Sequence, residues 1–298
     1  MPKIVPTNPH PFGSQEWIHQ MFKDPPARVV KGRNKWTHRH APWVDHLGRL
    51  AFVESRNELI GLLVLQYLRN INAVRRYKEQ AFKTDEAVFG QEYTPDLAFE
   101  TINRQIYVVE VKTARFVTRI MEVAFENLKA RFSDFNFNFL VWTDQAPLIH
   151  PLRHNLLLLR RAAAEFIEPD ETARLVDMLC QKGPMPLWAL SNHGLDITLV
   201  AHAAWNGQVH MPLLSAIEGS TTIAEHHGGG IRREAADHDV VVPRCANHSE
   251  ASRSNSRNRM KASRGIISSP TIQSRRGMLS NSPPTRSSSE MIVTIVKM

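Results

Sequence analysis

The chain has 298 residues, of which 42% are hydrophobic and 22% charged, as in an ordinary soluble globular protein with room for two modest domains. Its apolar runs, such as Leu156–Leu159, are too short to cross a bilayer, and Met1–Phe12 lacks the apolar block of a signal peptide, so we expect a cytoplasmic protein. The two cysteines, Cys180 and Cys245, are too few for a disulfide framework, and neither they nor the 14 histidines have the spacing of a zinc site.

The formal net charge of +8 comes almost entirely from the C-terminal part of the sequence. From residue 226 onward there are twelve of the 37 Lys and Arg and five of the 29 Asp and Glu, which leaves 25 against 24 in residues 1–225. Residues 226–298 are rich in Arg, Ser and Asn with little apolar spacing, which predicts a disordered basic tail. An unnatural extension, such as a frameshifted C-terminus, has the same composition. The overall charge therefore says little about how the folded part binds nucleic acid.

Residues 1–50 are predicted to form an irregular N-terminal arm with a short helix near Gln15–Phe22. Basic residues alternate there with Trp17, Trp36 and Trp43. This pattern suits an arm that grips a nucleic-acid backbone and stacks on bases. It suits equally an arm whose tryptophans attach it to the core.

Residues 51–147 have the periodicities of an α/β domain. In chain order we expect a helix from Ser55, an extended segment Ala73–Phe82, a strand beginning at Pro95–Phe99, a strand Ile106–Lys112, a helix Thr118–Arg131 and a strand Phe135–Thr143. In the helix Thr118–Arg131, we expect Ile120, Val123, Ala124 and Leu128 to share one side. This order of elements predicts a mixed sheet flanked by helices.

Residues 148–225 have a different pattern, dominated by helices. We expect helices at Leu152–Phe166, Glu171–Gln181, Pro186–Ser191 and Asp196–Trp205, followed by an extended segment Gln208–Leu214. Short helices followed by a strand and a turn are typical of a winged-helix module. Asp196–Trp205 contains no Lys or Arg, so the module lacks a basic recognition helix and favours a protein partner over a DNA groove.

Four charged residues of the α/β domain form a candidate site. Glu110 and Lys112 share one face of an otherwise apolar strand, where charged side chains usually have a partner or a function. Asp96 enters the neighbouring strand after Pro95, and Glu58 lies in the first turn of the helix that Ser55 begins. Carboxylates hold Mg²⁺, which polarises a phosphodiester and activates water, and a lysine stabilises developing negative charge.

Each of these residues also has a plainer explanation. A Glu-x-Lys pair on a strand is commonly a solvated face, and Pro-Asp before a strand is often only a turn. Glu58 fits a capping box with Ser55, and Glu54, one turn earlier, is a rival for the helix carboxylate. The occurrence of all four residues in this order is what favours a function.

Four runs in order, Glu54–Glu58, Tyr77–Gln80, Tyr93–Asp96 and Val109–Lys112, together resemble the N-terminal domain of TnsA-type transposon endonucleases, which belong to the PD-(D/E)XK nuclease superfamily. The resemblance covers about Lys31–Asp144, including the Phe139–Asp144 strand. It implies that Glu58, Asp96 and Glu110 hold Mg²⁺, with Mn²⁺ as a possible substitute, and that Lys112 is the catalytic lysine. Gln80 would have a structural or substrate-positioning role, and Ala81 stands where the family usually has proline.

The resemblance further implies a restriction-endonuclease-like fold followed by a winged helix, in a bacterial protein. Its activity would be nicking of the 5′ strand at transposon ends within a heteromeric cut-and-paste transposase. The partners would be double-stranded DNA, a DDE transposase and an AAA+ ATPase regulator contacted by the C-terminal module, with no membrane partner. Two alternatives stay open: a stand-alone restriction or repair nuclease, and a catalytically inactive DNA- or protein-binding scaffold.

Overall fold

The computed structural model describes residues 8–28, 40, 42–44, 47–84, 86–145 and 148–226. Nearly all of the expected basic tail and the arm segment around Trp36 lie outside these residues. No helix in the described ranges is both long and apolar enough to span a membrane.

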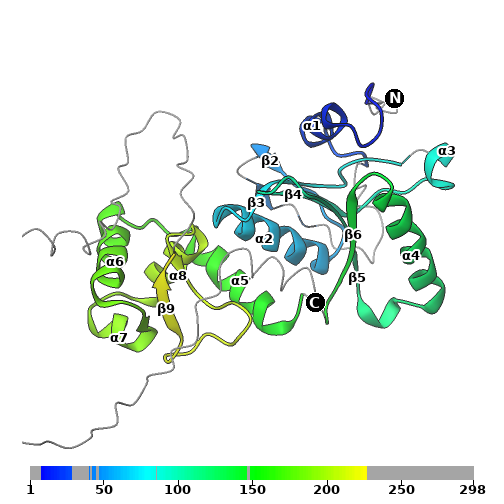
Figure 1. Ribbon diagram of the computed structural model, residues 1–298. Helices are drawn as coiled ribbons and strands as arrows, with labels where there is room; N and C mark the ends of the chain where they lie inside the picture. The colour runs from blue at the N-terminus through cyan, green and yellow to red at the C-terminus, as the bar shows by residue number, and fades with distance from the viewer. Residues whose placement is uncertain are drawn as a thin grey trace, which may run out of the picture.

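A four-stranded mixed sheet forms the centre of the first domain (Figure 1). Its strands, in spatial order, are β3 (Val74–Glu79), β4 (Leu97–Thr101), β5 (Ile106–Lys112) and β6 (Phe137–Thr143). The pairs β3–β4 and β4–β5 are antiparallel, whereas β6 runs parallel to β5. A parallel pair needs a crossover, and here it runs through η2 (Ala114–Phe116) and α4 (Arg119–Ser133). The α/β expectation of a mixed sheet flanked by helices is confirmed.

Helix α2 (Arg56–Asn70) packs closely against one face of this sheet. Ser55 caps the helix as expected, because its Oγ accepts a hydrogen bond from the Glu58 backbone N–H at 3.1 Å. Gly61 allows the close packing, since a Cβ at that position would lie 2.9 Å from Leu97 Cδ1. The close approach brings the first turn of α2, with Glu58, to the end of the sheet.

The other face carries an aromatic core beneath α1 (Gln15–Lys23) and α4. The expected N-terminal helix is confirmed, and Trp17 is buried, so this tryptophan attaches the arm to the core. In α4, Leu128 and Phe132 are the buried residues. Ile120 and Val123, which we expected to share a side with Leu128, are 82% and 58% exposed, because the packed face of α4 is instead formed by Met121, Phe125, Leu128 and Phe132.

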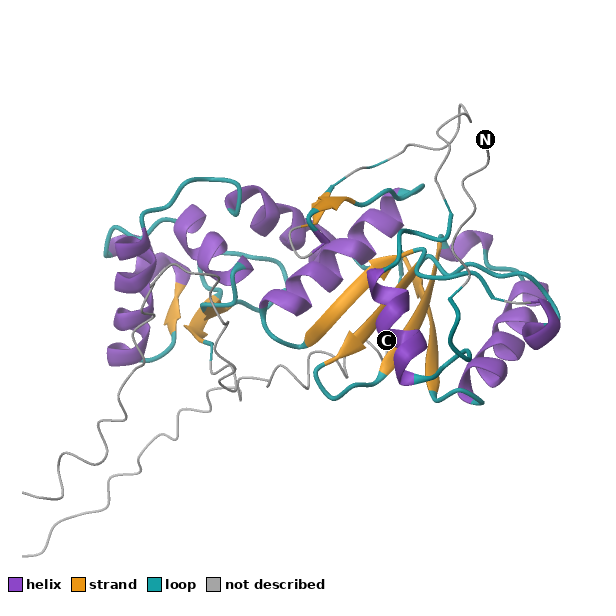
Figure 2. Cartoon of the chain, turned by 90° about the horizontal axis from the view of Figure 1, so that it is seen from above, coloured by secondary structure: helices purple, strands orange, loops and turns teal. Residues whose placement is uncertain are grey.

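The C-terminal module consists of helices with a small sheet (Figures 1 and 2). Its helices are α5 (His150–Ala162), α6 (Pro169–Lys182), α7 (Leu187–Asn192) and α8 (Ile197–Trp205), and its sheet has the order β7 (Met185–Pro186), β9 (Thr222–Glu225), β8 (Val209–His210). All four expected helices are present, whereas β7 and β9 were not expected. The remaining short elements are β1 (Trp43–Val44), β2 (Arg49–Leu50) and α3 (Glu86–Phe89).

The two parts share one hydrophobic core instead of meeting at a polar interface. A single cluster of buried side chains extends from α2 and the sheet into α5, α6 and α8. At the junction, Asn70 Nδ2 donates to the Trp205 carbonyl at 2.9 Å. A Cβ on Gly207 would lie only 2.6 Å from the Asn70 carbonyl oxygen, so this contact requires glycine. The C-terminal module therefore packs against the C-terminal end of α2.

Candidate active site

Strand pairing places Asp96 beside Glu110. Leu97 pairs with Val109 in the antiparallel β4–β5 ladder, so the residues one step further along are Asp96 and Glu110. Both carboxylates are buried, with residue exposures of 9% and 7%. Asp96 Oδ2 accepts the Val111 backbone N–H at 2.8 Å, which fixes the carboxylate against the end of β5.

Lys112 joins the two carboxylates. Its Nζ forms an ion pair with Glu110 Oε1 and lies 4.0 Å from Asp96 Oδ2. Glu110 and Lys112 project from the same face of β5, as the period of two predicts. The structure thus brings three of the four candidate residues together.

The fourth, Glu58, lies at the start of α2, next to the end of β5. The neighbouring Asn57 donates from Nδ2 to the Lys112 carbonyl at 3.4 Å. Glu58 Oε2 accepts the Glu54 backbone N–H at 2.9 Å, one residue before the N-cap Ser55, so the side chain stabilises the helix start but not through the reciprocal bond of a capping box. Its rival Glu54 instead pairs with Arg28 at 3.2 Å. The charge of Glu58, and not that of Glu54, contributes to raising the pKa of Asp96, so Glu58 is the helix carboxylate closer to the cluster.

The carboxylates repel one another in a poorly hydrated place. Burial, followed by the charges of Glu110 and Glu58, raises the pKa of Asp96 to about 8. Burial also raises the pKa of Glu58 above its usual value. Burial alone would lower the pKa of Lys112, but Glu110 and Asp96 outweigh this effect and raise it. A cation placed among these groups would relieve the repulsion.

Tyr93 is a residue of the site that our sequence reasoning did not include. Its hydroxyl donates to Glu110 Oε2 at 2.5 Å. Burial and the Glu110 charge raise the pKa of Tyr93 well above its usual value, so the hydroxyl keeps its proton. The available signal was its position three residues before Asp96, in one of the four runs that carry the resemblance.

Gln80 holds the end of β3 beside Asp96. Its backbone N–H donates to the Asp96 carbonyl at 2.9 Å, and its Oε1 accepts from Arg28 Nε at 3.3 Å. The residue has a positive φ of 41°, and its Nε2 is buried without a hydrogen-bond partner. The structural role and the substrate-positioning role expected for Gln80 both stay open.

The oxygen ligands fit a small divalent cation that keeps some of its water. Within the described residues, no three or more His, Cys, Asp or Glu side chains converge tightly enough to enclose an ion. Mg²⁺ does not need such a cage, since it is usually held by one or two carboxylates together with water and substrate phosphates. Asp96 and Glu110 provide that pair, with Glu58 close enough to add its charge.

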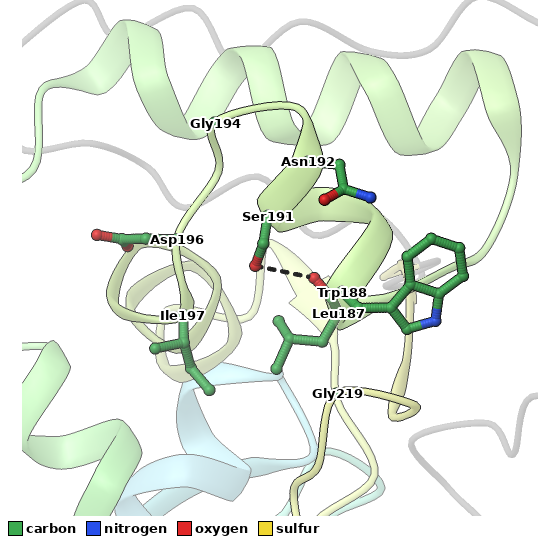
Figure 3. A pocket seen from close by; sticks show the side chains of 8 residues that line it. All are labelled: Leu187, Trp188, Ser191, Asn192, Gly194, Asp196, Ile197 and Gly219. Atoms are coloured by element: carbon green, nitrogen blue, oxygen red, sulfur yellow. Dashed lines mark hydrogen bonds between the residues drawn. The ribbon is translucent and has the colours of Figure 1, made fainter.

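A hollow of about 620 Å³ lies elsewhere, on the C-terminal module (Figure 3). Leu187, Trp188 and Ile197 line it, and Trp188 is 57% exposed. It contains none of the four candidate residues. A shallow, partly apolar surface of this kind suits contact with another protein better than chemistry on a small molecule.

Comparison with known proteins adds no family to these observations. No protein-family model matches the chain, and no curated protein is significantly similar to it. The resemblance to TnsA-type endonucleases therefore depends on the four sequence runs.

Proposed function

We propose that the protein is a metal-dependent DNA endonuclease. The observation that carries this proposal is a deficit of positive charge at the end of β4 and β5. Glu58, Asp96 and Glu110 are all buried, and among the described residues Lys112 is the one cation that forms an ion pair with Asp96 or Glu110, while Glu58 forms none. Buried carboxylates without matching cations are costly, and a divalent cation is the ligand that would stabilise them.

In this proposal, Asp96 and Glu110 hold Mg²⁺ or Mn²⁺, and Glu58 adds charge to the site. The cation would polarise the scissile phosphate and promote ionisation of a water molecule. Lys112 binds Glu110 in this structure, and with a cation in the site its ammonium group would stabilise negative charge that develops on the phosphate. The Val111 N–H keeps Asp96 oriented throughout.

We further propose that this nuclease acts in transposition, nicking the 5′ strand at transposon ends beside a DDE transposase. The C-terminal module would be a winged-helix-like docking domain for an AAA+ ATPase regulator. In support, α8 (Ile197–Trp205) contains no Lys or Arg, and the exposed Trp188 lies at an open hollow. The basic tail would add nonspecific attraction to DNA.

The test is strand cleavage by the purified full-length protein together with its DDE transposase, with Mg²⁺ or Mn²⁺ or with a chelator. We expect metal-dependent nicking that Asp96→Ala and Lys112→Ala both abolish, while the exposed Asp177→Ala control on α6 keeps it. Equal nicking by the wild type and both site variants would refute the assignment. Transposition that survives Asp96→Ala in cells would instead favour the inactive scaffold.

A further inference from the structure

We propose that Tyr93 is a positioning residue that restricts Glu110 to one free oxygen and so makes the site prefer Mg²⁺ over Ca²⁺. This inference rests on the proposed metal-dependent function. It assigns a role to a side chain that lies next to a candidate ligand without being one itself.

The hydrogen bonds of Glu110 divide its two oxygens between different partners. Oε2 accepts the Tyr93 hydroxyl at 2.5 Å, and Oε1 faces the Lys112 ammonium. Lys112 Nζ also forms an ion pair with Asp96, at 4.0 Å from Oδ2. A cation that replaces the ammonium there would therefore meet Oε1 of Glu110, while Oε2 remains bound to Tyr93.

The hydroxyl is not needed to hold the Tyr93 segment in place. The Tyr93 backbone N–H donates to Thr84 Oγ1 at 2.8 Å, and its carbonyl accepts the Thr84 N–H at 2.8 Å. The Tyr93 ring packs edge-on against Phe132 and Phe139, with centroid distances of 6.1 and 6.3 Å. A phenylalanine would keep all of these contacts, so the hydrogen bond to Glu110 is what the hydroxyl adds.

The number of oxygens that a carboxylate offers affects which cation it prefers. Ca²⁺ takes six to eight oxygens and readily binds a carboxylate through both of them, whereas Mg²⁺ requires a compact octahedral set and takes one. The Tyr93 hydroxyl blocks two-oxygen binding by Glu110 and orients the oxygen that remains. Groups that orient a ligand in this way typically change metal affinity about 10- to 100-fold when they are removed.

The experiment is calorimetric titration of full-length protein with Mg²⁺ and separately with Ca²⁺. It compares the wild type, Tyr93→Phe and the matched control Tyr107→Phe, which removes a hydroxyl bonded at 3.1 Å to Gln105 on the same sheet, away from the site. For Tyr93→Phe we expect Mg²⁺ affinity to fall about 10-fold, with Ca²⁺ affinity unchanged or increased. The control should keep both affinities, and all three proteins should have similar melting temperatures.

Equal losses for both ions, or no loss for either, would overturn the role of Tyr93. A second comparison tests whether Tyr93 acts through Glu110: in a Glu110→Ala background, Tyr93→Phe should cause no further change, and an additional loss there would also overturn it. Failure of the proposed function gives a different result. In that case the wild type would bind neither Mg²⁺ nor Ca²⁺, or Asp96→Ala would bind them as well as the wild type does. If the wild type binds Mg²⁺ and nicks DNA while Tyr93→Phe has unchanged metal affinities, the role of Tyr93 is overturned and the proposed function is not.

Discussion

Asp96→Asn is expected to stabilise the metal-free protein while removing its response to metal. The pKa of Asp96 is raised from 3.8 to about 8, so the folded state binds this proton more tightly than the unfolded state. The stability that Asp96 contributes is therefore fully present below pH 4 and is lost as the pH rises through about 8. Asparagine does not titrate, and its Oδ1 can still accept the Val111 N–H.

The size of the effect follows from this pKa difference. A shift of roughly four units corresponds to an upper limit of about 6 kcal/mol, at about 1.4 kcal/mol per unit. Water and side-chain movement screen buried charges, so we expect a gain of about 2–3 kcal/mol for Asp96→Asn above pH 8. For a folded part of this size, that gain corresponds to an increase of about 5–10 °C in melting temperature.

The assay is unfolding followed by circular dichroism, in the presence of a chelator, at pH 4.5, 6.5 and 9. The stability difference between Asp96→Asn and the wild type should increase with pH, whereas the exposed control Asp177→Asn should show no such trend. Added Mg²⁺ should raise the melting temperature of the wild type and not of Asp96→Asn. A difference that is independent of pH, or a destabilisation that grows with pH, would refute the electrostatic argument.

Three further predictions concern the fold that holds the site. Burial lowers the pKa of Lys78 from 10.5 to about 8, so burying its charge destabilises the fold below pH 8. The stability of the wild type should therefore rise between pH 8 and about pH 10.5, and Lys78→Met should lack this rise in the same unfolding assay. Gly61→Val should cost about 1–3 kcal/mol in urea unfolding because its side chain would overlap the sheet, whereas the exposed Ala124→Val should change little. Phe132→Ala should cost about 3–5 kcal/mol because Phe132 is fully buried, and the exposed Phe116→Ala should remain within about 0.5 kcal/mol of the wild type.

The relation among Asp96, Glu110 and Lys112 could be predicted because it depends on local rules. Alternation along one strand puts Glu110 and Lys112 on the same face, and the short connection from β4 to β5 leaves few possible registers. The start of α2 was equally predictable from the cap at Ser55. These rules concern residues close in sequence, and sequence patterns report such relations well.

The remaining features depend on contacts that no local pattern encodes. Tyr93 reaches Glu110 because its backbone N–H is hydrogen-bonded to Thr84 Oγ1, which holds the segment before β4 in place. This hydrogen bond does not follow from composition. Lys78 is a charged residue in a strand where most residues are charged, which predicts a solvated side chain. In the structure it is buried and donates to the Met21 carbonyl of α1 at 2.7 Å. Ile120 has the spacing of a packed position but is exposed, because the apolar residues of α4 fit two overlapping faces and the periodicity does not say which one meets the sheet.

The described residues of the same domain include two other buried acids, Glu79 and Glu100, and both have arginine partners. Glu79 accepts two hydrogen bonds from Arg49, and Glu100 is paired with Arg75, Arg76 and Arg104. Each of these acids has at least one arginine, which is the usual condition for burying a charge. At the end of β4 and β5 the ratio is reversed, with three carboxylates for one lysine. Among the described residues, the other buried acids of the sheet have arginine counter-ions and these three carboxylates do not, and this contrast is the reason for proposing that a cation binds here.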